Sequence, residues 1–246
     1  MSFRKSNNKA LILAAGLGTR LRPITDSRPK SLVSVNGKPI LLKQIENLML
    51  NGIVDITIIS GYKADVLEKV VHEKYPGIQI IESVDYATTN NMYSAYLGIK
   101  GMFPDGDIKP FYMMNADVFF DASVITTLEK DARYNLIVVD IDRYNEESMK
   151  VIQKGERLIA ISKKISSVDA LGCSIDVYKF GADGGKAFFN RCVDYILGQK
   201  DRNKWSEVAL NDALADVVFQ ACPLDGRWFE IDNHEDLAAA EKLFSE

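Results

Sequence analysis

The sequence is short of the residues that disulfide, thiol and histidine chemistry require. Its 246 residues include three cysteines and two histidines. Cys173, Cys192 and Cys222 lie far apart, so no pair has the spacing of a zinc knuckle or a redox motif, and an odd number fits a disulfide framework poorly. We therefore expect buried free thiols in a reducing cytoplasm. Because His72 and His234 are the only histidines, a metal ion has to be held mainly by carboxylates, which suits Mg²⁺.

The chain also lacks long apolar runs, low-complexity segments and convincing internal repeats. No apolar run approaches the roughly 20 residues of a membrane-spanning helix, so no membrane partner is expected. At 47% hydrophobic and 26% charged residues, the composition is that of an ordinary globular protein, which excludes the disordered and fibrous classes. We expect a cytoplasmic protein with a single domain over residues 1–246. No heptad pattern or large apolar patch points beyond a monomer or homodimer.

Positive charge is unevenly placed along the chain. The net charge is −4, which argues against a general nucleic-acid binder, because such a protein needs a broad cationic face. Residues 1–43 nevertheless hold nine Lys or Arg and a single acid, Asp26, while the remainder holds 21 basic and 33 acidic residues. An apolar strand is embedded in the basic segment, which does not favour a basic surface stripe. A cationic segment on an acidic body instead indicates a site for an anionic small molecule.

Short apolar runs alternate with longer amphipathic ones, which is typical of strand-helix-strand units around a largely parallel sheet. We predict strands at 10–14, 55–59, 79–81, 111–114, 136–140, 174–180 and 228–231, and a hairpin within 150–164. Helices are expected from Pro39, taken as the first helical residue, to about residue 50, at 64–75, 91–100, 182–198 and 205–218, and at the C-terminal end. The predicted fold class is α/β: a three-layer Rossmann-like core with a mixed, mostly parallel sheet and a small β-rich subregion at about 143–180.

A glycine-bearing loop follows the first predicted strand and is the most informative segment. It reads Leu13-Ala14-Ala15-Gly16-Leu17-Gly18-Thr19-Arg20-Leu21-Arg22-Pro23. Ligands bind at strand ends in doubly wound sheets, where small residues let backbone N–H groups approach phosphate oxygens closely. The guanidinium of Arg20 suits two phosphate oxygens at once, and Lys30 adds a point charge. A tight turn without a ligand is the competing interpretation, and Gly-x-Gly alone would not decide between them.

Two common phosphate-binding motifs do not fit this loop. A dinucleotide-binding fingerprint requires a third glycine where Leu21 stands, and an acid at the end of the second strand, where Ser60-Gly61 stands. A P-loop requires Lys-Ser or Lys-Thr directly after its second glycine, and Thr19-Arg20 follows here. Neither motif explains the segment.

The loop does resemble the signature loop of the nucleotidyltransferases that make nucleoside-diphosphate sugars and alcohols. The resemblance rests on Ala14-Ala15-Gly16-x-Gly18-Thr19-Arg20, followed by Pro23, Thr25 and Pro29-Lys30. It implies a Rossmann-like nucleotidyltransferase fold in which the loop wraps a triphosphate, while Arg20 and Lys30 stabilise the departing pyrophosphate and the transition state. The nucleotide-binding residues that the resemblance implies are Leu13, Ala14, Ala15, Gly16, Gly18, Thr19, Arg20, Lys30, Asn91 and Asp117.

Two aspartates stand at predicted strand ends. Asp117 closes the apolar strand at 111–114, and Asp232 closes the strand at 228–231. An acid at the carboxyl end of a buried strand lies where the ligand crevice should be, although Asp is also a favoured helix N-cap and helix-like sequence follows Asp232. Both segments are similar to the metal-binding segments of the family. This implies Mg²⁺ held by Asp117 and Asp232, which join Arg20 and Lys30 as the predicted catalytic residues.

Other segments resemble the phosphocholine cytidylyltransferase-like branch, whose members serve bacterial surface-polymer pathways. They are Asn90-Asn91-Met92-Tyr93-Ser94, Ser148 to Val151, Ile161 to Lys163, Gly172 to Phe180 and Leu210 to Asp212. The branch implies CTP as the nucleotide. The predicted acceptor-binding residues are Asn91, Tyr93, Ser94, Lys163, Tyr178 and Glu230.

The acceptor itself stays open. Choline-specific relatives tend to be aromatic and acidic near Asn211-Asp212, whereas this chain reads Glu207-Val208-Ala209-Leu210. A phosphorylated amino-alcohol, a phosphonate such as 2-aminoethylphosphonate, a phospho-amino acid or a polyol phosphate all fit. The alternatives are a sugar-1-phosphate nucleotidyltransferase that uses UTP, dTTP or GTP, and a non-catalytic nucleotide-binding regulatory subunit of the same fold.

Overall fold

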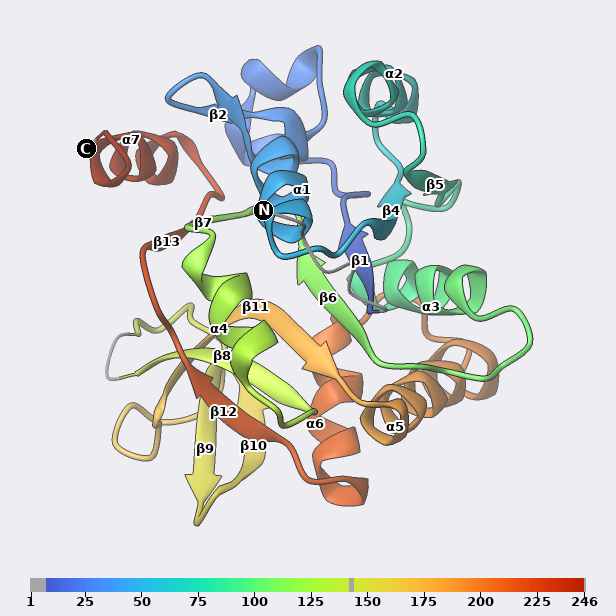
Figure 1. The fold of residues 1–246 in the computed structure, drawn as a ribbon, viewed down its shortest axis with the longest axis vertical. Helices are drawn as coiled ribbons and strands as arrows, with labels where there is room; N and C mark the ends of the chain where they lie inside the picture. Colours follow the sequence, from blue (N-terminus) through green and yellow to red (C-terminus); the bar gives the residue numbers. More distant parts are fainter. Residues whose placement is uncertain (1–7, 142–143, 246) are drawn as a thin grey trace.

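The computed structural model describes residues 8–141 and 144–245, and nine of its strands form one central sheet (Figure 1). These strands are β1 (Lys9–Leu13), β4 (Asp55–Ser60), β5 (Gln79–Glu82), β6 (Phe111–Asn115), β8 (Leu136–Ile141), β9 (Lys150–Lys154), β10 (Arg157–Ser162), β11 (Gly172–Phe180) and β12 (Gln220–Pro223). Their order is β10-β9-β11-β6-β1-β4-β5, with β8 pairing β11 and β12 pairing β8. The predicted α/β class with a mixed sheet is confirmed.

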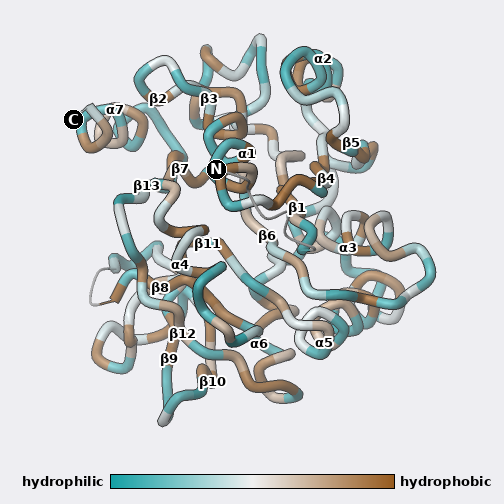
Figure 2. The backbone as a smooth tube through the Cα atoms, viewed as in Figure 1, coloured by the Kyte–Doolittle hydropathy of each residue, from teal (hydrophilic) through white to brown (hydrophobic). Residues whose placement is uncertain are grey.

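Helices cover both faces of the sheet and make the three layers. The helices are α1 (Ile40–Leu50), α2 (Ala64–Lys74), α3 (Asn91–Met102), α4 (Ser123–Lys130), α5 (Ala182–Val193), α6 (Ser206–Asp216) and α7 (His234–Leu243). Alternate residues of β1 point to opposite faces, as strand geometry requires. Leu11 and Leu13 pack with residues of α3, α5 and α6, whereas Ala10 and Ile12 pack with residues of α1, α2 and α4. The hydropathy colouring shows apolar residues along β4 and more polar residues on α2 (Figure 2).

The sheet has a parallel and an antiparallel half. β6, β1, β4 and β5 run parallel, so their carboxyl ends meet at one edge. β11 runs antiparallel to β6 and β8, and the hairpin β9–β10 continues the sheet beside β11. The register of β11 against β8 shifts between Ser174 and Tyr178, where Asp176 has a left-handed backbone with φ of 57°. The expected β-rich subregion is therefore this antiparallel half, and its first residue, 143, lies outside the described residues.

A small second sheet brings two distant segments together. β7 (Val118–Phe120) pairs antiparallel with β13 (Trp228–Glu230), and the backbone N–H of Ile231 donates to the carbonyl of Asp117 at 2.9 Å. Leu21, Val33, Phe119 and Ile231 form a third apolar cluster under this sheet. Asp117, which precedes β7, and the residues that follow β13 are thereby held side by side.

Several short elements escaped the sequence prediction. β7, α4 and β12 are three, eight and four residues long, too short for a clear hydrophobic period, and β12 ends on Pro223. The two-residue strands β2 (Ser34–Val35) and β3 (Lys38–Pro39) make Pro39 the N-cap of α1, so the prediction of Pro39 as its first helical residue was wrong. The expected helix at 182–198 is α5 followed by a π-helical turn at Asp194–Gly198. Among the described residues, no helix is long and apolar enough to cross a membrane.

Candidate active site

A cavity of about 310 Å³ opens at the carboxyl ends of β1 and β6. Its wall includes residues from the loop after β1, the start of α3, the end of β6, β11 and the segment around β13. The residues that line the cavity include Leu13, Ala14, Ala15, Gly16, Arg20, Lys30, Ser31, Asn91, Ser94, Asn115, Asp117, Glu147, Lys163, Asp176, Trp205, Trp228, Glu230 and Asp232. The edge of a doubly wound sheet where strand order reverses is where such folds bind ligands.

The loop after β1 forms the first wall of the cavity. Its start is tied to β4, since the N–H of Ala14 donates to the carbonyl of Ile59 at 2.8 Å. Gly18 has φ of +60°, and a Cβ there would lie 2.7 Å from the Cβ of Lys30, so the close fold of the loop over Lys30 requires glycine. Of the residues predicted to bind nucleotide, Gly18 and Thr19 belong to the loop but are not among the described lining residues. Leu13, Ala14, Ala15, Gly16, Arg20 and Lys30 line the cavity itself.

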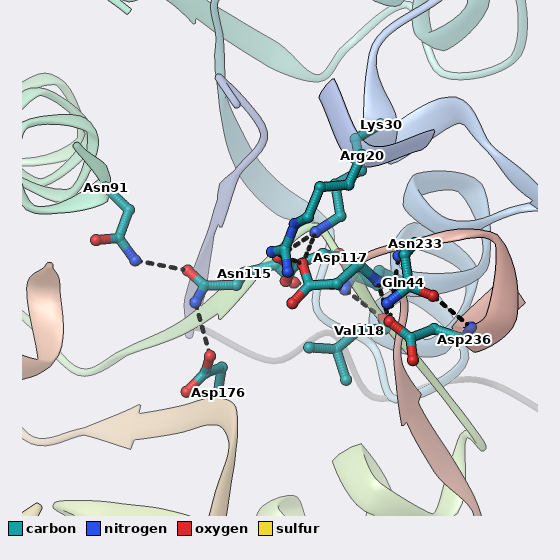
Figure 3. A network of polar contacts seen from close by, with 11 residues as sticks. Arg20, Lys30, Gln44, Asn91, Asn115, Asp117, Val118, Asp176, Asn233 and Asp236 are labelled. Carbon is teal, nitrogen blue, oxygen red and sulfur yellow. Dashed lines mark hydrogen bonds and ion pairs between the residues drawn. The ribbon is translucent and has the colours of Figure 1, made fainter. Parts of the chain in front are cut away.

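Lys30 lies between the two predicted carboxylates. Its Nζ is 2.9 Å from Oδ2 of Asp117 and 2.6 Å from Oδ1 of Asp232, and a guanidinium nitrogen of Arg20 is 2.9 Å from the same oxygen of Asp232 (Figure 3). Burial lowers the pKa of Lys30, but the two carboxylates outweigh it and the net shift is upward. Burial raises the pKa of Asp232, and Lys30 and Arg20 reverse this to a net lowering. The structure therefore brings the four predicted catalytic residues into one ion-paired cluster.

Hydrogen bonds from behind hold the two aspartates in place. The buried amide of Gln44, on α1, donates to the carbonyls of Asn115 and Val118 at 2.9 and 2.8 Å and so clamps the turn that carries Asp117 (Figure 3). Oδ2 of Asp236 accepts from the backbone N–H of Asp232 at 3.0 Å and from that of Asn233 at 3.1 Å, the second bond being part of the capping box of α7. Sequence reasoning missed Gln44, because a polar residue on an apolar helix face carries no signal of what it clamps.

The carboxylates at this point fit a divalent cation. Ligand oxygens of Asp117, Glu230 and Asp232 lie within 4.8 Å of one another. Oδ1 of Asp117 is buried and has no hydrogen-bond partner among the described residues, which leaves it free to bind a cation. Burial, Asp117 and Asp232 raise the pKa of Glu230 to about 7. Oxygen-only ligands suit Mg²⁺, and Glu230, predicted only as an acceptor contact, joins the two predicted ligands.

A hydrogen-bonded network of acids and amides forms the second wall of the cavity, opposite the loop, which we also call the acidic wall. Nδ2 of Asn91 donates to Oδ1 of Asn115 at 3.4 Å, and Nδ2 of Asn115 donates to Oδ2 of Asp176 at 2.9 Å (Figure 3). The hydroxyl of Tyr178 donates to Oδ1 of Asp176 at 2.8 Å and lies 3.4 Å from Oε1 of the buried Glu207. This wall contains two carboxylates that the sequence prediction did not single out.

The two acids Asp176 and Glu207 both have raised pKa values, and burial is the largest cause for each. Burial is the largest cause of the upward shift at Asp176, followed by the charges of Glu207, Glu230 and Asp117. Burial also raises the pKa of Glu207. Lys30 compensates Asp117 and Asp232, but no cation is hydrogen-bonded to Asp176 within the described chain. Sequence reasoning missed Asp176 because it lies in the middle of an apolar strand, where only the bulge turns its side chain toward the cavity.

The remaining predicted acceptor residues are divided between the cavity and its surroundings. Ser94 and Lys163 line the cavity, and the Lys163 ammonium lies 5.0 Å from the ring centroid of Trp205. Tyr178 is 1% exposed and acts from behind through Asp176. Tyr93 lies outside the described lining and stacks on Tyr96 with ring centroids 6.2 Å apart.

Two indoles line the cavity as well. They belong to Trp205 and Trp228, and Nε1 of Trp228 donates to Oδ2 of Asp140 at 2.6 Å. The acidic wall therefore has aromatic neighbours.

Comparisons with known proteins agree with this geometry. A model of the nucleotidyl transferase family matches residues 9–166, more than half of the chain. The choline-phosphate cytidylyltransferase of Streptococcus pneumoniae is 37% identical over 156 residues, which cover 62% of this chain and 67% of that protein. The 2-aminoethylphosphonate cytidylyltransferase of Lancefieldella rimae is 38% identical over 90 residues, 37% of this chain and 36% of that protein.

The other similar proteins include a sugar-phosphate guanyltransferase and two solved structures. The mannose-1-phosphate guanyltransferase beta-A of Xenopus laevis is 30% identical over 176 residues, 65% of this chain and 48% of that protein, so this chain spans about half the length of that relative. Among solved structures, the CTP:phosphocholine cytidylyltransferase of Streptococcus pneumoniae superposes with a TM-score of 0.76 at 30% identity, covering 95% of this chain and 97% of that one. The inositol-1-phosphate CTP transferase of T. maritima, at 20% identity and a TM-score of 0.78, covers 98% of this chain and 97% of that one and shows a shared fold.

Proposed function

This chain belongs to the nucleotidyl transferase family, and we propose that it transfers CMP from CTP to a small acceptor that carries a phosphate or phosphonate. The choice of CTP is supported by the two cytidylyltransferases at 37% and 38% identity. In the proposed reaction an acceptor oxygen attacks the α-phosphorus of CTP. A new P–O bond forms, the bond to the β-phosphate oxygen breaks, and pyrophosphate leaves with the electron pair.

The first wall would hold the reacting phosphates. Backbone N–H groups of the loop after β1 and the Arg20 guanidinium would bind the β- and γ-phosphates, where charge accumulates as pyrophosphate departs. Lys30, with a raised pKa, stays protonated and would follow the charge on the α-phosphoryl group. The chain needs no general base, because the acceptor oxygen is already anionic near neutral pH.

Nucleotidyl transferases typically use a divalent metal ion, and the carboxylates here suit one. We infer that Asp117 and Asp232, with Glu230 beside them, would hold Mg²⁺, which would neutralise charge between the two phosphate groups. Lys30 and Arg20 are hydrogen-bonded or ion-paired to these carboxylates now, so both would exchange part of this contact for phosphate oxygens when substrates bind.

The second wall would select an acceptor with a positive charge. Asp176 and Glu230 line the cavity, both have raised pKa values caused by burial and neighbouring acids, and an organic ammonium would relieve that repulsion. The indoles of Trp205 and Trp228 add faces that attract a cation. A phosphorylated amino-alcohol or an aminoalkyl phosphonate, as named for the two cytidylyltransferase relatives, fits this wall better than a sugar phosphate or polyol phosphate without a positive charge.

The observation that carries this proposal is the position of Lys30 between Asp117 and Asp232 in the cavity beside the loop after β1, with the acidic wall lining the same cavity. The test is pyrophosphate release with CTP, UTP, dTTP and GTP, each combined with phosphocholine, phosphoethanolamine, 2-aminoethylphosphonate and mannose 1-phosphate, in the presence of Mg²⁺. We expect turnover with CTP and an amine-bearing acceptor. Turnover only with a sugar phosphate would overturn the acceptor assignment, and nucleotide binding without any pyrophosphate release would indicate a regulatory protein.

A further inference from the structure

Three serine hydroxyls are buried without a hydrogen-bond partner among the described residues. They belong to Ser31, Ser60 and Ser83, whose side chains are 2%, 1% and 0% exposed. A hydroxyl removed from water without a partner is destabilising, so each calls for a physical reason. Only Ser31 lines the cavity, and Ser60 and Ser83 are absent from its described wall.

The backbone around Ser31 fixes where its side chain lies. Ser31 is the middle residue of a 3-10 helix, Lys30–Leu32, which follows Pro29. The N–H of Leu32 donates to the carbonyl of Pro29 at 2.9 Å, and the N–H of Val33 donates to that of Lys30 at 2.9 Å. These bonds fix the backbone of Ser31 next to Lys30, in the wall of the cavity.

The neighbours of Ser31 decide what it would bind. Lys30 precedes it in the chain, and the loop residues Gly16 and Arg20 belong to the same wall. Two cationic side chains and a glycine-bearing loop make this the anion-binding end of the cavity. A hydroxyl donates a short hydrogen bond to an oxyanion, and such a bond is stronger than one between neutral groups.

We propose that the Ser31 hydroxyl, buried and unpartnered beside Lys30, donates a hydrogen bond to a phosphoryl oxygen of the bound nucleoside triphosphate. The inference rests on the proposed function for the identity of the ligand. Ser31 is then a substrate-binding residue whose partner is supplied by the substrate. Because every nucleoside triphosphate presents the same phosphates, the contact does not depend on the base.

The test compares Ser31→Ala with Ser60→Ala and Ser83→Ala, which remove equally buried and unpartnered hydroxyls elsewhere. For Ser31→Ala we expect kcat/KM for the triphosphate to fall roughly 10- to 100-fold, the loss of one hydrogen bond to a charged group. Its melting temperature without ligand should stay the same or rise, since an unsatisfied hydroxyl is gone. The two control variants should keep wild-type kcat/KM.

Thermal shift with CTP and with inorganic pyrophosphate adds a readout that does not need turnover. The rise in melting temperature caused by each ligand should shrink in Ser31→Ala and persist in both controls. A wild-type shift in Ser31→Ala, or an equal loss of kcat/KM in all three variants, would overturn the inference. If no acceptor supports turnover, the proposed function fails, and the shift with UTP, GTP and CTP still decides the role of Ser31.

Discussion

The two walls of the cavity are built in different ways. The first wall, which we propose binds the phosphates, comes mostly from one stretch of chain, from Leu13 to Ser31, and its cations Arg20 and Lys30 pair with two aspartates. The opposite wall draws Asn91, Asn115 and Asp176 from three separate elements, α3, β6 and β11, with Glu207 of α6 behind them. The first wall is a local motif, whereas the second exists only once the sheet has formed.

The walls also differ in electrostatics. On the first wall, opposite charges lie within 3 Å, so the pKa of Asp232 is lowered and that of Lys30 is raised. On the second wall, burial raises the pKa values of Asp176 and Glu207, and the charges of neighbouring acids raise them further. On the first wall, the positive and negative side chains of the protein balance one another. On the second wall, the proposed cationic ligand would supply the balancing charge. We therefore propose that the first wall serves the nucleotide chemistry and that the second wall selects the acceptor.

The largest expected effect is the loss of either aspartate on the first wall. For Asp117→Asn and Asp232→Asn we expect turnover to fall on the order of a thousand-fold, because several kcal/mol of charge stabilisation disappears with the metal ligand. Steady-state pyrophosphate release measures this, and circular dichroism checks that the fold remains. Asp55→Asn is the matched control, since Asp55 pairs with Lys9 at 3.1 Å at the other end of the sheet. Full activity in both site variants would remove the metal assignment.

A somewhat smaller effect is expected for Lys30→Ala. Turnover should fall roughly a hundred-fold, because Lys30 is proposed to strengthen its contact in the transition state. The affinity for CTP, measured by calorimetry, should fall much less, since Arg20 and the loop amides remain. Unchanged turnover, or a loss confined to CTP affinity, would place Lys30 outside the chemistry.

Asp176→Asn tests whether the second wall acts on the acceptor alone. We expect the KM for an amine-bearing acceptor to rise roughly ten-fold or more, the loss of one close charge pair, while the KM for CTP stays constant. Glu147→Gln is the control, because Glu147 also lines the cavity but its side chain is 90% exposed. An equal rise in both KM values for Asp176→Asn would erase the functional difference between the walls.

How much the sequence could predict follows the same division. The sequence predicts Arg20, Lys30, Asp117 and Asp232 as a group, and in the structure three ion pairs, Arg20–Asp232, Lys30–Asp232 and Lys30–Asp117, link all four. They are readable because a glycine-bearing loop and acids at strand ends are local patterns. Whether they bind metal and nucleotide stays a prediction until the variants are measured.

The second wall was largely hidden in the sequence. Asp176 reaches the cavity because β11 bulges between Ser174 and Tyr178, and no composition signal marks that register shift. Glu207 is buried on a helix whose exposed and buried faces cannot be told apart before α6 is packed against α5 and β10. Non-local packing, which periodicity does not encode, decides both positions.

The smallest predicted effect concerns stability against pH and separates the walls by sign. The folded-state pKa of Asp176 is raised above its unfolded value of about 3.9, so the unfolded chain ionises first as pH rises. Wild-type stability is therefore lost progressively above about pH 4, until pH passes the folded pKa. Asp176→Asn removes this loss and can keep both hydrogen bonds, with its carbonyl accepting from Asn115 and its amide donating to Tyr178.

Urea unfolding of the wild type and Asp176→Asn between pH 4 and 8 measures this difference. We expect the variant to gain stability relative to the wild type as pH rises across this range. In metal-free buffer, the same comparison for Asp232→Asn, extended from pH 5 down to pH 2, should give the opposite sign: the folded pKa of Asp232 is lowered, so its contribution to stability is present above the unfolded pKa and is lost as pH falls through the folded pKa. Parallel pH dependences in the two variants would show that the walls share one electrostatic environment, and the division between them would then rest on position alone.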